Sequence, residues 1–237
     1  MKDDNRMRWR DEFLSGALEI LPIVLAAVPI SLLWGTLAVK KGFSPLETAL
    51  ASASMFGGAA QFVAIDLWRE PVPWFLVIIS VFVVNARHVL MGASLSRHLG
   101  VIAPHLRPFV MFLLVDEVWA LAERRVLQRP LTWPYYLGLG LPLWLSWTVA
   151  SIFGALIGRS LGEPATFGLD FAFPSLFIAI LASVWKGPKT GAILAASGAV
   201  AALSKLFIPG AWYIVLGGLA GVALAAATHA PESTDAC

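Results

Sequence analysis

The sequence has little charge and almost no cysteine. Charged residues make up 14% of the 237 residues and hydrophobic residues 58%, whereas soluble proteins carry about 25% charged residues. A surface with so little charge excludes an ordinary soluble enzyme. The single cysteine, Cys237, excludes a disulfide scaffold and a cysteine-based metal site. A net charge of +2 with scattered basic residues excludes a nucleic-acid-binding surface.

Several motifs of enzymes and ATP-driven proteins are also missing. The sequence has no G-x-x-x-x-G-K-[ST] for nucleotides, no H-E-x-x-H for zinc and no G-x-S-x-G for a nucleophilic serine. Its four histidines, His88, His98, His105 and His229, are not spaced as a metal pair. We therefore expect no metal, no cofactor and no enzyme. An intramembrane enzyme, or a scaffold or channel subunit, remains the alternative.

Long charge-free windows show where the chain can lie in a membrane. A helix crossing the ~30 Å hydrocarbon layer needs about 20 apolar residues. The apolar stretches are rich in Ala, Gly and Leu and lack the alternation of a β-barrel. The sequence predicts an all-α integral membrane protein, a polytopic bundle of about eight (7–8) transmembrane helices, some of them broken. The expected segments are 14–39, 47–67, 72–96, 107–127, 134–158, 169–185, 190–207 and 211–228.

Loops of about 5 to 12 residues leave no room for a soluble domain. We expect a cytoplasmic arm over 1–13, a single transport domain over 14–228 and a polar tail over 229–237. With eight spans and the N-terminus inside, inside segments hold ten Lys or Arg and outside loops hold six. This count places Arg69 inside and Arg97 and Arg107 outside. It is a modest positive-inside bias.

Ionisable groups inside apolar segments need a reason, because each costs about 2.5–3.5 kcal/mol at the bilayer centre. Asn85, Arg87 and His88 follow one apolar run and precede another, and Asp116 and Glu117 interrupt a third. Two interpretations stay open: a structural ion pair between Arg87 and one of these acids, or a substrate site. In the second, Arg87 receives a carboxylate, while an acid binds an ammonium group or carries a proton.

Other charges have simpler interpretations. Glu19 lies near a predicted helix end, where it can reach the headgroup region. Arg124 and Arg125 read as plain interface charges. Asp170 begins a predicted segment, where a carboxylate suits the positive end of a helix, and it is also a candidate for proton coupling.

Two predicted segments contain helix-breaking residues. The second carries Phe56-Gly57-Gly58-Ala-Ala-Gln61-Phe62, and the sixth carries Phe171-Ala-Phe173-Pro174-Ser-Leu-Phe177. Aligning Phe56 with Phe171 places the breaks at similar positions, which suggests a weak internal repeat and points to a transporter site. Broken helices expose amides and carbonyls that can bind both ends of a zwitterion. Close helix packing is the alternative explanation for the glycine pair.

The same stretches resemble the large subunit of AzlC-type branched-chain amino acid permeases. The resemblance covers roughly residues 15–190 and is most specific in Asn85-Ala-Arg-His88 and Gly168-Leu-Asp-Phe-Ala-Phe-Pro174. It departs from the family pattern at Ala59 and Val115, where the family usually has Ser and Thr.

This resemblance implies a secondary transporter in the bacterial inner membrane that exports branched-chain amino acids, with a small AzlD-type membrane subunit as partner. The site residues expected from sequence and resemblance together fall into two groups. Substrate binding is expected at Phe56, Gly57, Gly58, Gln61, Phe62, Asn85, Arg87, His88, Phe173 and Pro174. Proton coupling or ion pairing is expected at Asp116, Glu117 and Asp170.

Overall fold

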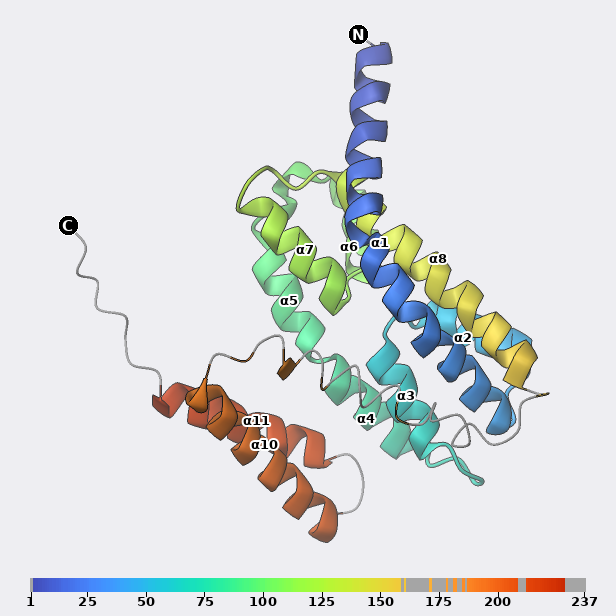
Figure 1. The fold of residues 1–237 in the computed structure, drawn as a ribbon, viewed down its shortest axis with the longest axis vertical. Helices are drawn as coiled ribbons and strands as arrows, with labels where there is room; N and C mark the ends of the chain where they lie inside the picture. Colours follow the sequence, from blue (N-terminus) through green and yellow to red (C-terminus); the bar gives the residue numbers. More distant parts are fainter. Residues whose placement is uncertain are drawn as a thin grey trace.

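The computed structural model describes residues 2–158, 160, 171, 178, 181–182, 185, 187–208 and 212–228. The regular elements of these residues are helices (Figure 1). The elements are α1 (Lys2–Lys40), α2 (Pro45–Ser54), α3 (Gly58–Leu67), α4 (Trp74–Asn85), α5 (Arg87–Ser96), η1 (Leu99–Val101), η2 (Pro104–Leu106), α6 (Arg107–Phe112), α7 (Asp116–Val126), α8 (Trp133–Gly158), α10 (Pro188–Phe207) and α11 (Trp212–Thr228).

Helices α1 and α8 lie side by side along much of their length and run in the same direction (Figure 1). Glycines bring their backbones together, because a Cβ on Gly35 would overlap the carbonyl oxygen of Ser151. A Cβ on Gly154 would likewise overlap the carbonyl oxygen of Leu32. Thr36 donates a 3.1 Å hydrogen bond to the Gly154 carbonyl. Small residues allow this close approach between membrane helices, where packing rather than hydrophobicity drives association.

Helices α2 and α3 form a hairpin that enters and leaves on the same side. Ser44 caps α2 in a capping box with Glu47, and the helix ends at Ser54. After the break at Met55–Gly57, α3 runs back, so that the Trp68 ring packs 4.7 Å from the Phe43 ring. Lys41 Nζ also donates to the Trp68 carbonyl at 3.1 Å. The two ends of the hairpin therefore meet beside the C-terminal end of α1.

Helices α4 and α5 are almost continuous and form one long apolar stretch, Trp74–Ser96. Only Ala86 separates them. The stretch is long enough to cross a membrane, at 23 residues. It carries the chain from the end where α3 finishes to the end where α1 begins (Figure 1).

A second hairpin, α6–α7, enters from that end. Tyr136, near the start of α8, donates to the Val110 carbonyl of α6, and Phe112 packs farther along α8 against Trp144. After Leu113–Val115 the chain reverses, and α7 runs back until Arg125 pairs with Glu12 of α1. The tips of the two hairpins thus approach each other from opposite sides, near the middle of α8.

The hairpins correct the predicted topology. Segments 47–67 and 107–127 were expected to cross the membrane, but each turns back at a break. Among the described residues, four stretches are long and apolar enough to span: Trp9–Lys40, Trp74–Ser96, Trp133–Gly158 and Pro188–Phe207. The predicted break in 47–67 is confirmed at Gly57. Segment 169–185 and the proposed match of Phe171 to Phe56 fall mainly outside the described residues.

The helices form two units with the same order of elements, and the two units run in opposite directions across the bundle. A spanning helix followed by a hairpin describes α1 with α2–α3, and the same order describes α4–α5 with α6–α7. This pairing differs from the repeat expected from the sequence. Opposed units of this kind are a common plan in membrane transporters, where the binding site lies between them.

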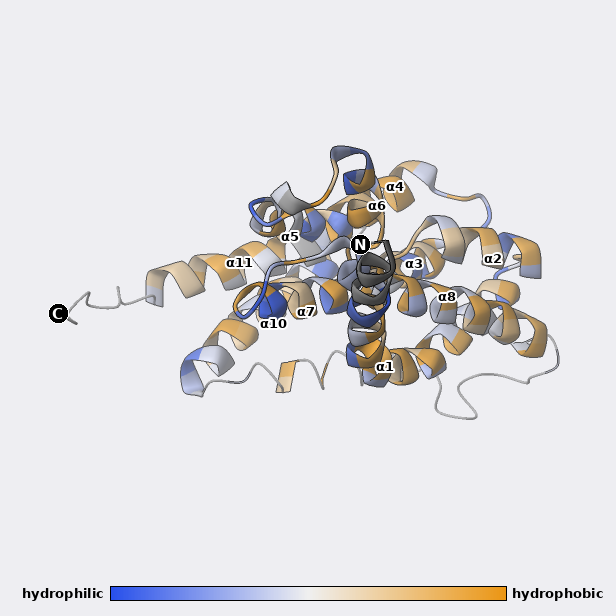
Figure 2. Ribbon diagram, turned by 90° about the horizontal axis from the view of Figure 1, so that it is seen from above, coloured by the Kyte–Doolittle hydropathy of each residue, from blue (hydrophilic) through white to orange (hydrophobic). Residues whose placement is uncertain are grey.

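Two buried clusters flank the hairpin tips. The first packs α1, α5, α6, α7 and the start of α8 around Val118, Tyr135 and Leu139. The second packs the C-terminal half of α1 with α3 around Trp34, Phe62 and Trp147. Outside these clusters the helices are largely hydrophobic, while hydrophilic residues gather at connections and helix ends (Figure 2). Such a surface suits contact with lipid.

Helices α10 and α11 pack against each other, and α11 touches α4. A Cβ built on Gly217 would lie 2.8 Å from the Ala201 side chain, so small residues again set the contact. α10 has no buried side chain among its described residues. Its exposed Leu203, Leu206 and Phe207 are consistent with a surface covered by lipid or by another membrane protein.

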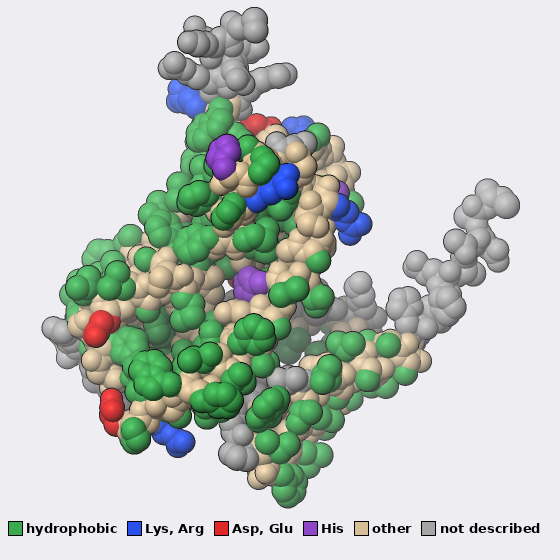
Figure 3. Space-filling view, turned by 180° about the vertical axis from the view of Figure 1, so that it is seen from behind, with side chains coloured by type: hydrophobic (Ala, Val, Ile, Leu, Met, Phe, Trp, Pro, Cys, Tyr) green, Lys and Arg blue, Asp and Glu red, His purple; other side chains and the backbone are tan. Residues whose placement is uncertain are grey.

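The hairpins also redistribute the basic residues. Arg10, Arg97, Arg107, Arg124, Arg125 and Arg129 now belong to the end where α1 begins, and Lys40, Lys41 and Arg69 to the opposite end. Figure 3 shows Lys and Arg side chains gathered near the end where α1 begins. Arg69, Arg97 and Arg107 therefore change sides relative to the sequence-based topology. Among these nine residues the distribution becomes six against three, whereas the eight-span topology gives five against four.

Replacing Gly154 by Ala is expected to lower the melting temperature of the detergent-purified protein. The new methyl group would meet the α1 backbone at Leu32, and overpacking of this kind costs about 1–3 kcal/mol. Gly198→Ala on α10 is the matched control, because nothing lies within 4 Å of a Cβ there. Equal melting temperatures for the two variants would contradict the close contact of α1 with α8.

Thiol labelling can test the hairpins directly in a Cys237→Ser background. Lys41→Cys and Glu70→Cys flank α2–α3. Both are expected to react with an impermeant reagent from the same face of the membrane and from that face only. His105→Cys and Gln128→Cys flank α6–α7 and are expected to react only from the opposite face. All four positions are exposed. Reaction of Lys41→Cys and Glu70→Cys from different faces would show that 47–67 spans the membrane.

Candidate functional site

A cavity of about 520 Å³ lies where the helix breaks come together. The α2–α3 break contributes Phe56, Gly57 and Gly58, and the α6–α7 break contributes Val115 to Glu117. Arg87, just after the α4–α5 break, completes this side. Three breaks that are distant in sequence thus meet at one cavity at mid-depth in the bundle, as expected for a transporter site.

The charged side of the cavity contains one ion pair and a further acid. Arg87 Nη1 lies 2.8 Å from Asp116 Oδ2, and both side chains keep partial exposure, at 35% and 48%. Arg87 Nε is buried without a hydrogen-bond partner among the described residues. Glu117 lines the same cavity and is half-buried. The structure is therefore compatible with both interpretations of Arg87 from the sequence, as a partner in an ion pair and as part of a substrate site.

Helix N-termini add positive potential around the cavity. Helices α3, α5 and α7 begin at Gly58, Arg87 and Asp116, all of which line it. No side chain caps the N-terminus of α3, α5 or α7. Asp116 and Glu117 complement the dipole of α7, whereas Arg87 places a cation at the positive end of α5. An anionic group in the cavity would therefore be stabilised by the Arg87 guanidinium and by the first amides of α3, whereas α5 adds little because it almost continues α4.

The opposite wall is apolar. Helix α1 provides Pro22, Ile23, Ala26, Ala27 and Ile30, and α8 provides Leu143 and Trp147. The two alanines leave space between larger side chains. The cavity can therefore hold a molecule with charged groups at one end and a hydrocarbon group at the other.

Gln61 and Phe62 were predicted to bind substrate, but they do not line the cavity. Gln61 is fully buried and donates to the Met55 carbonyl at 2.7 Å, while its Oε1 accepts a 2.9 Å bond from Trp147 Nε1. Phe62 is buried in the second cluster. Their role here is structural: Gln61 satisfies the backbone freed by the α2–α3 break, and Phe62 packs α3 against α1.

Asn85 and His88 lie near the cavity without lining it. His88 Nδ1 is 3.1 Å from the carbonyl oxygen of Asn85, the last residue of α4. Asn85 lines a second pocket, of about 570 Å³, between α4 and the α2–α3 hairpin. Its Oδ1 would lie 3.7 Å from a Cβ on Gly57. Both residues thus support the α4–α5 break.

Asp170, Phe173 and Pro174 lie outside the described residues, and their predicted roles stay predictions. Sequence reasoning also missed the α1 and α8 residues of the apolar wall. The available signal was the spacing of Ile23, Ala27 and Ile30, which places them on one helix face. Trp147 gave no such signal in the sequence. Its ring can lie at the cavity only because residue 58 is a glycine and leaves space for it. A Cβ there would lie 2.7 Å from Trp147 Cη2.

Fold and site together define a polytopic membrane protein with broken helices around a cavity that has charged groups on one side and apolar groups on the other, as in membrane carriers. Residues 22–161 match the family described as AzlC protein, and the chain belongs to this family. It is a membrane protein of the transporter-like, permease type.

Similar proteins are also described as membrane proteins. The chain is 31% identical to "Inner membrane protein YgaZ" of Escherichia coli over 204 residues, covering 83% of each chain. It is 31% identical to an uncharacterized membrane protein of Archaeoglobus fulgidus over 194 residues, covering 81% of this chain and 84% of the relative. An uncharacterized membrane protein of Haemophilus influenzae is 25% identical over 204 residues. No solved structure gives a significant match.

A double-mutant cycle can test the role of Gln61. Trp147→Phe leaves Gln61 Oε1 without its donor, and an unsatisfied buried group costs about 1–3 kcal/mol. Gln61→Leu also removes the bond to Met55. We expect each single variant to melt at a lower temperature than the parent, with the double variant less destabilised than the sum of the two. Strict additivity would contradict a direct bond between these side chains.

Proposed function

We propose that this protein is a secondary transporter that exports small apolar, branched-chain amino acids across the bacterial inner membrane. The cavity supports this proposal, because it combines opposite charges on one side with a hydrocarbon wall on the other. Family membership supports the substrate class. The words "inner membrane" in the name of the Escherichia coli relative support the location.

The proposed binding mode follows from charge. The substrate carboxylate is expected near Arg87, whose buried Nε has no partner among the described residues, and near the first amides of α3. The ammonium group is expected at Glu117, which lines the cavity beside the Arg87–Asp116 pair. The hydrocarbon side chain then faces α1 and α8, with Ala26 and Ala27 giving room for a branched group.

Coupling to protons is the proposed energy source. No nucleotide-binding glycine motif is present in the sequence, and carboxylates inside membrane segments commonly carry protons in transporters. Asp116 and Glu117 are the carboxylates at the cavity. Asp170 remains a further candidate from the sequence. Export requires that substrate enter from the cytoplasm, and the basic end where α1 begins is the expected cytoplasmic face.

A small AzlD-type membrane subunit is the proposed partner, on the basis of the family resemblance. The test is reconstitution of the purified chain in liposomes, with and without that subunit, using a panel of labelled amino acids. Flux of valine and leucine driven by a proton gradient is the expected result. Bound zinc or iron in the purified protein would instead favour an intramembrane enzyme. Absence of flux even with the partner would favour a scaffold or channel subunit.

Charge-neutralising variants in the cavity are expected to reduce transport of valine or leucine. Arg87→Ala, Asp116→Asn and Glu117→Gln should each lower flux at limiting substrate by at least about tenfold, since hydrogen bonds to charged groups contribute about 1.5–3 kcal/mol. Asp66→Asn is the matched control, because Asp66 is exposed near the C-terminal end of α3. Efflux from cells and uptake into inverted vesicles measure the effect. Wild-type flux in all three variants would disprove the site.

A further inference from the structure

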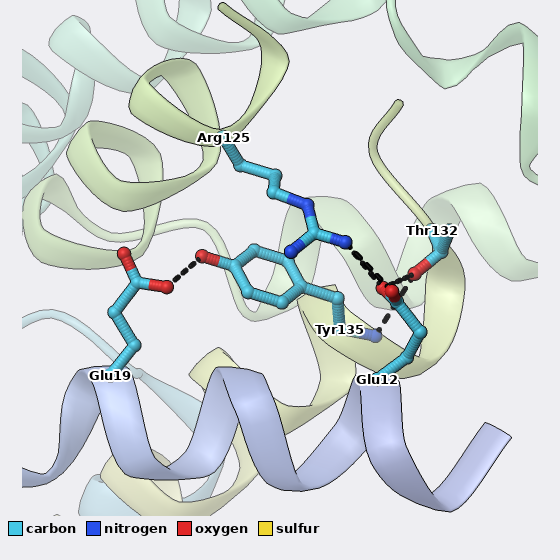
Figure 4. A network of polar contacts seen from close by, with 5 residues as sticks. All are labelled: Glu12, Glu19, Arg125, Thr132 and Tyr135. Atoms are coloured by element: carbon cyan, nitrogen blue, oxygen red, sulfur yellow. Dashed lines mark hydrogen bonds and ion pairs between the residues drawn. The ribbon is translucent and has the colours of Figure 1, made fainter. Parts of the chain in front are cut away.

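A polar network joins α1, α7 and the start of α8 at the end where α1 begins (Figure 4). Sequence reasoning treated Glu19 as a headgroup contact and Arg124 and Arg125 as interface charges, but all three are partners in this network. We call it the α7 clamp. Its members are Glu12, Glu19, Arg124, Arg125, Thr132 and Tyr135.

Arg125 forms the centre of the α7 clamp. Its Nη2 lies 2.8 and 2.7 Å from the two carboxylate oxygens of Glu12, and its guanidinium stacks 4.3 Å above the Tyr135 ring. Thr132 donates a 2.7 Å bond to the same carboxylate, and Tyr135 donates a 2.6 Å bond to Glu19. Arg124 pairs with Glu19 as well. The clamp therefore ties the end of α7 to both α1 and α8.

The other end of α7 is at the cavity. This helix has 11 residues, with Asp116 and Glu117 in its first turn and Arg124 and Arg125 in its last. Short helices move as rigid bodies, since their internal hydrogen bonds hold the backbone. A shift of the whole of α7 that begins at the clamp would therefore also move the two acids relative to Arg87.

Both hairpins are held by neutral hydrogen bonds, which for α6–α7 include Tyr136 to the Val110 carbonyl and Trp119 Nε1 to Ser94 Oγ, but α7 is also tied by ions. The α2–α3 hairpin is tied by buried bonds between neutral groups, such as Trp34 Nε1 to Ser52 Oγ at 2.8 Å and Trp147 to Gln61. The α7 clamp uses ions: the Arg124 and Glu12 side chains are 61% and 30% exposed, whereas the Arg125 side chain is largely buried, at 10%. The exposed Arg124 can exchange its partner for water at small net cost. The buried Arg125 must instead replace its carboxylate partner when α7 moves, because an unpaired buried charge is costly.

One hydrogen-bond donor of Arg125, its Nε, is buried and has no hydrogen-bond partner among the described residues. The clamped state therefore leaves a donor that can gain a partner, including water, if α7 moves.

We propose that the α7 clamp is a closed gate, and that its opening admits solvent and substrate to the cavity from the face where α1 begins. The proposal rests on the transport function proposed above. In this state the clamp keeps α7, and with it Asp116 and Glu117, against α1 and α8. Glu12, Arg125 and Tyr135 are thus positioning residues that act on the cavity through α7.

Labelling of a cavity thiol tests the gate without any substrate. Ala59→Cys, in a Cys237→Ser background, places a reporter at the cavity. An impermeant cationic thiosulfonate is applied to right-side-out and inside-out vesicles. Arg125→Gln and Tyr135→Phe are expected to raise the labelling rate from the face where α1 begins by about tenfold, the change expected when one charged hydrogen bond is lost. The rate from the opposite face should not rise.

Three further variants make the result specific. Arg125→Lys keeps the charge but loses the planar group that stacks on Tyr135, so it should label at a rate between that of the parent and that of Arg125→Gln. Glu12→Gln combined with Arg125→Gln should label no faster than Arg125→Gln alone, because the two residues act as one unit. Arg129→Gln, which removes a charge from the same end outside these contacts, is the control and should match the parent.

Two results would overturn the gate: an unchanged labelling rate from the face where α1 begins, or an equal rise from both faces with a lowered melting temperature. The second result would mean that the network only supports the fold. If Arg125→Gln does not fold, Tyr135→Phe decides, because it removes a single hydroxyl group. Labelling also remains informative if no amino acid is transported, so failure of the gate and failure of the proposed substrate are distinguishable.

Discussion

Backbone groups freed by a helix break inside a membrane must find partners within the protein, because hydrocarbon offers none. In this protein α8 supplies many of them. Trp144 donates to the Ala53 carbonyl near the tip of α2, and Tyr136 donates to the Val110 carbonyl of α6. Trp147 acts indirectly, since it fixes Gln61, which in turn donates to Met55. Both hairpins are therefore positioned on one helix.

That dependence explains why α1 and α8 pack so closely. A helix that positions two hairpins must itself be fixed, and the glycine contacts at positions 35 and 154 fix it against α1. Helix α1 then supplies the apolar wall of the cavity over Pro22 to Ile30. The same pair of helices thus supports the tips, encloses the site and holds the clamp at one end through Glu12, Thr132 and Tyr135.

The sequence predicted the membrane class, the apolar stretches in which most helices lie and the charged residues that line the cavity. Arg87, Asp116 and Glu117 were identifiable because an ionisable residue in an apolar segment is costly, and the break at Gly57 because glycine pairs interrupt helices. The two hairpins were not predictable by the same reasoning. A hydropathy window measures length and polarity, and a segment of 21 residues that turns back in its middle has the same values as one that crosses.

Residues such as Gln61 and Trp147 show a second limit. A polar residue in an apolar segment indicates that some partner exists, but both a ligand and a backbone carbonyl satisfy that need. Only the three-dimensional arrangement decides, and it assigns Gln61 to the hairpin tip and leaves the cavity to Arg87 and the acids of α7.

The opposed hairpins also account for the distribution of charge along the molecule. Because α6–α7 returns to the end where it entered, Arg97 and Arg107 join Arg124, Arg125 and Arg129 at one end. A cluster of cations is costly unless it is paired or solvated, and Glu12 and Glu19 pair two of these arginines. Two of the arginines gathered at this end, Arg124 and Arg125, are thus the residues that tie α7 to α1. The pairing that compensates this charge also fixes the end of the helix that carries the cavity acids.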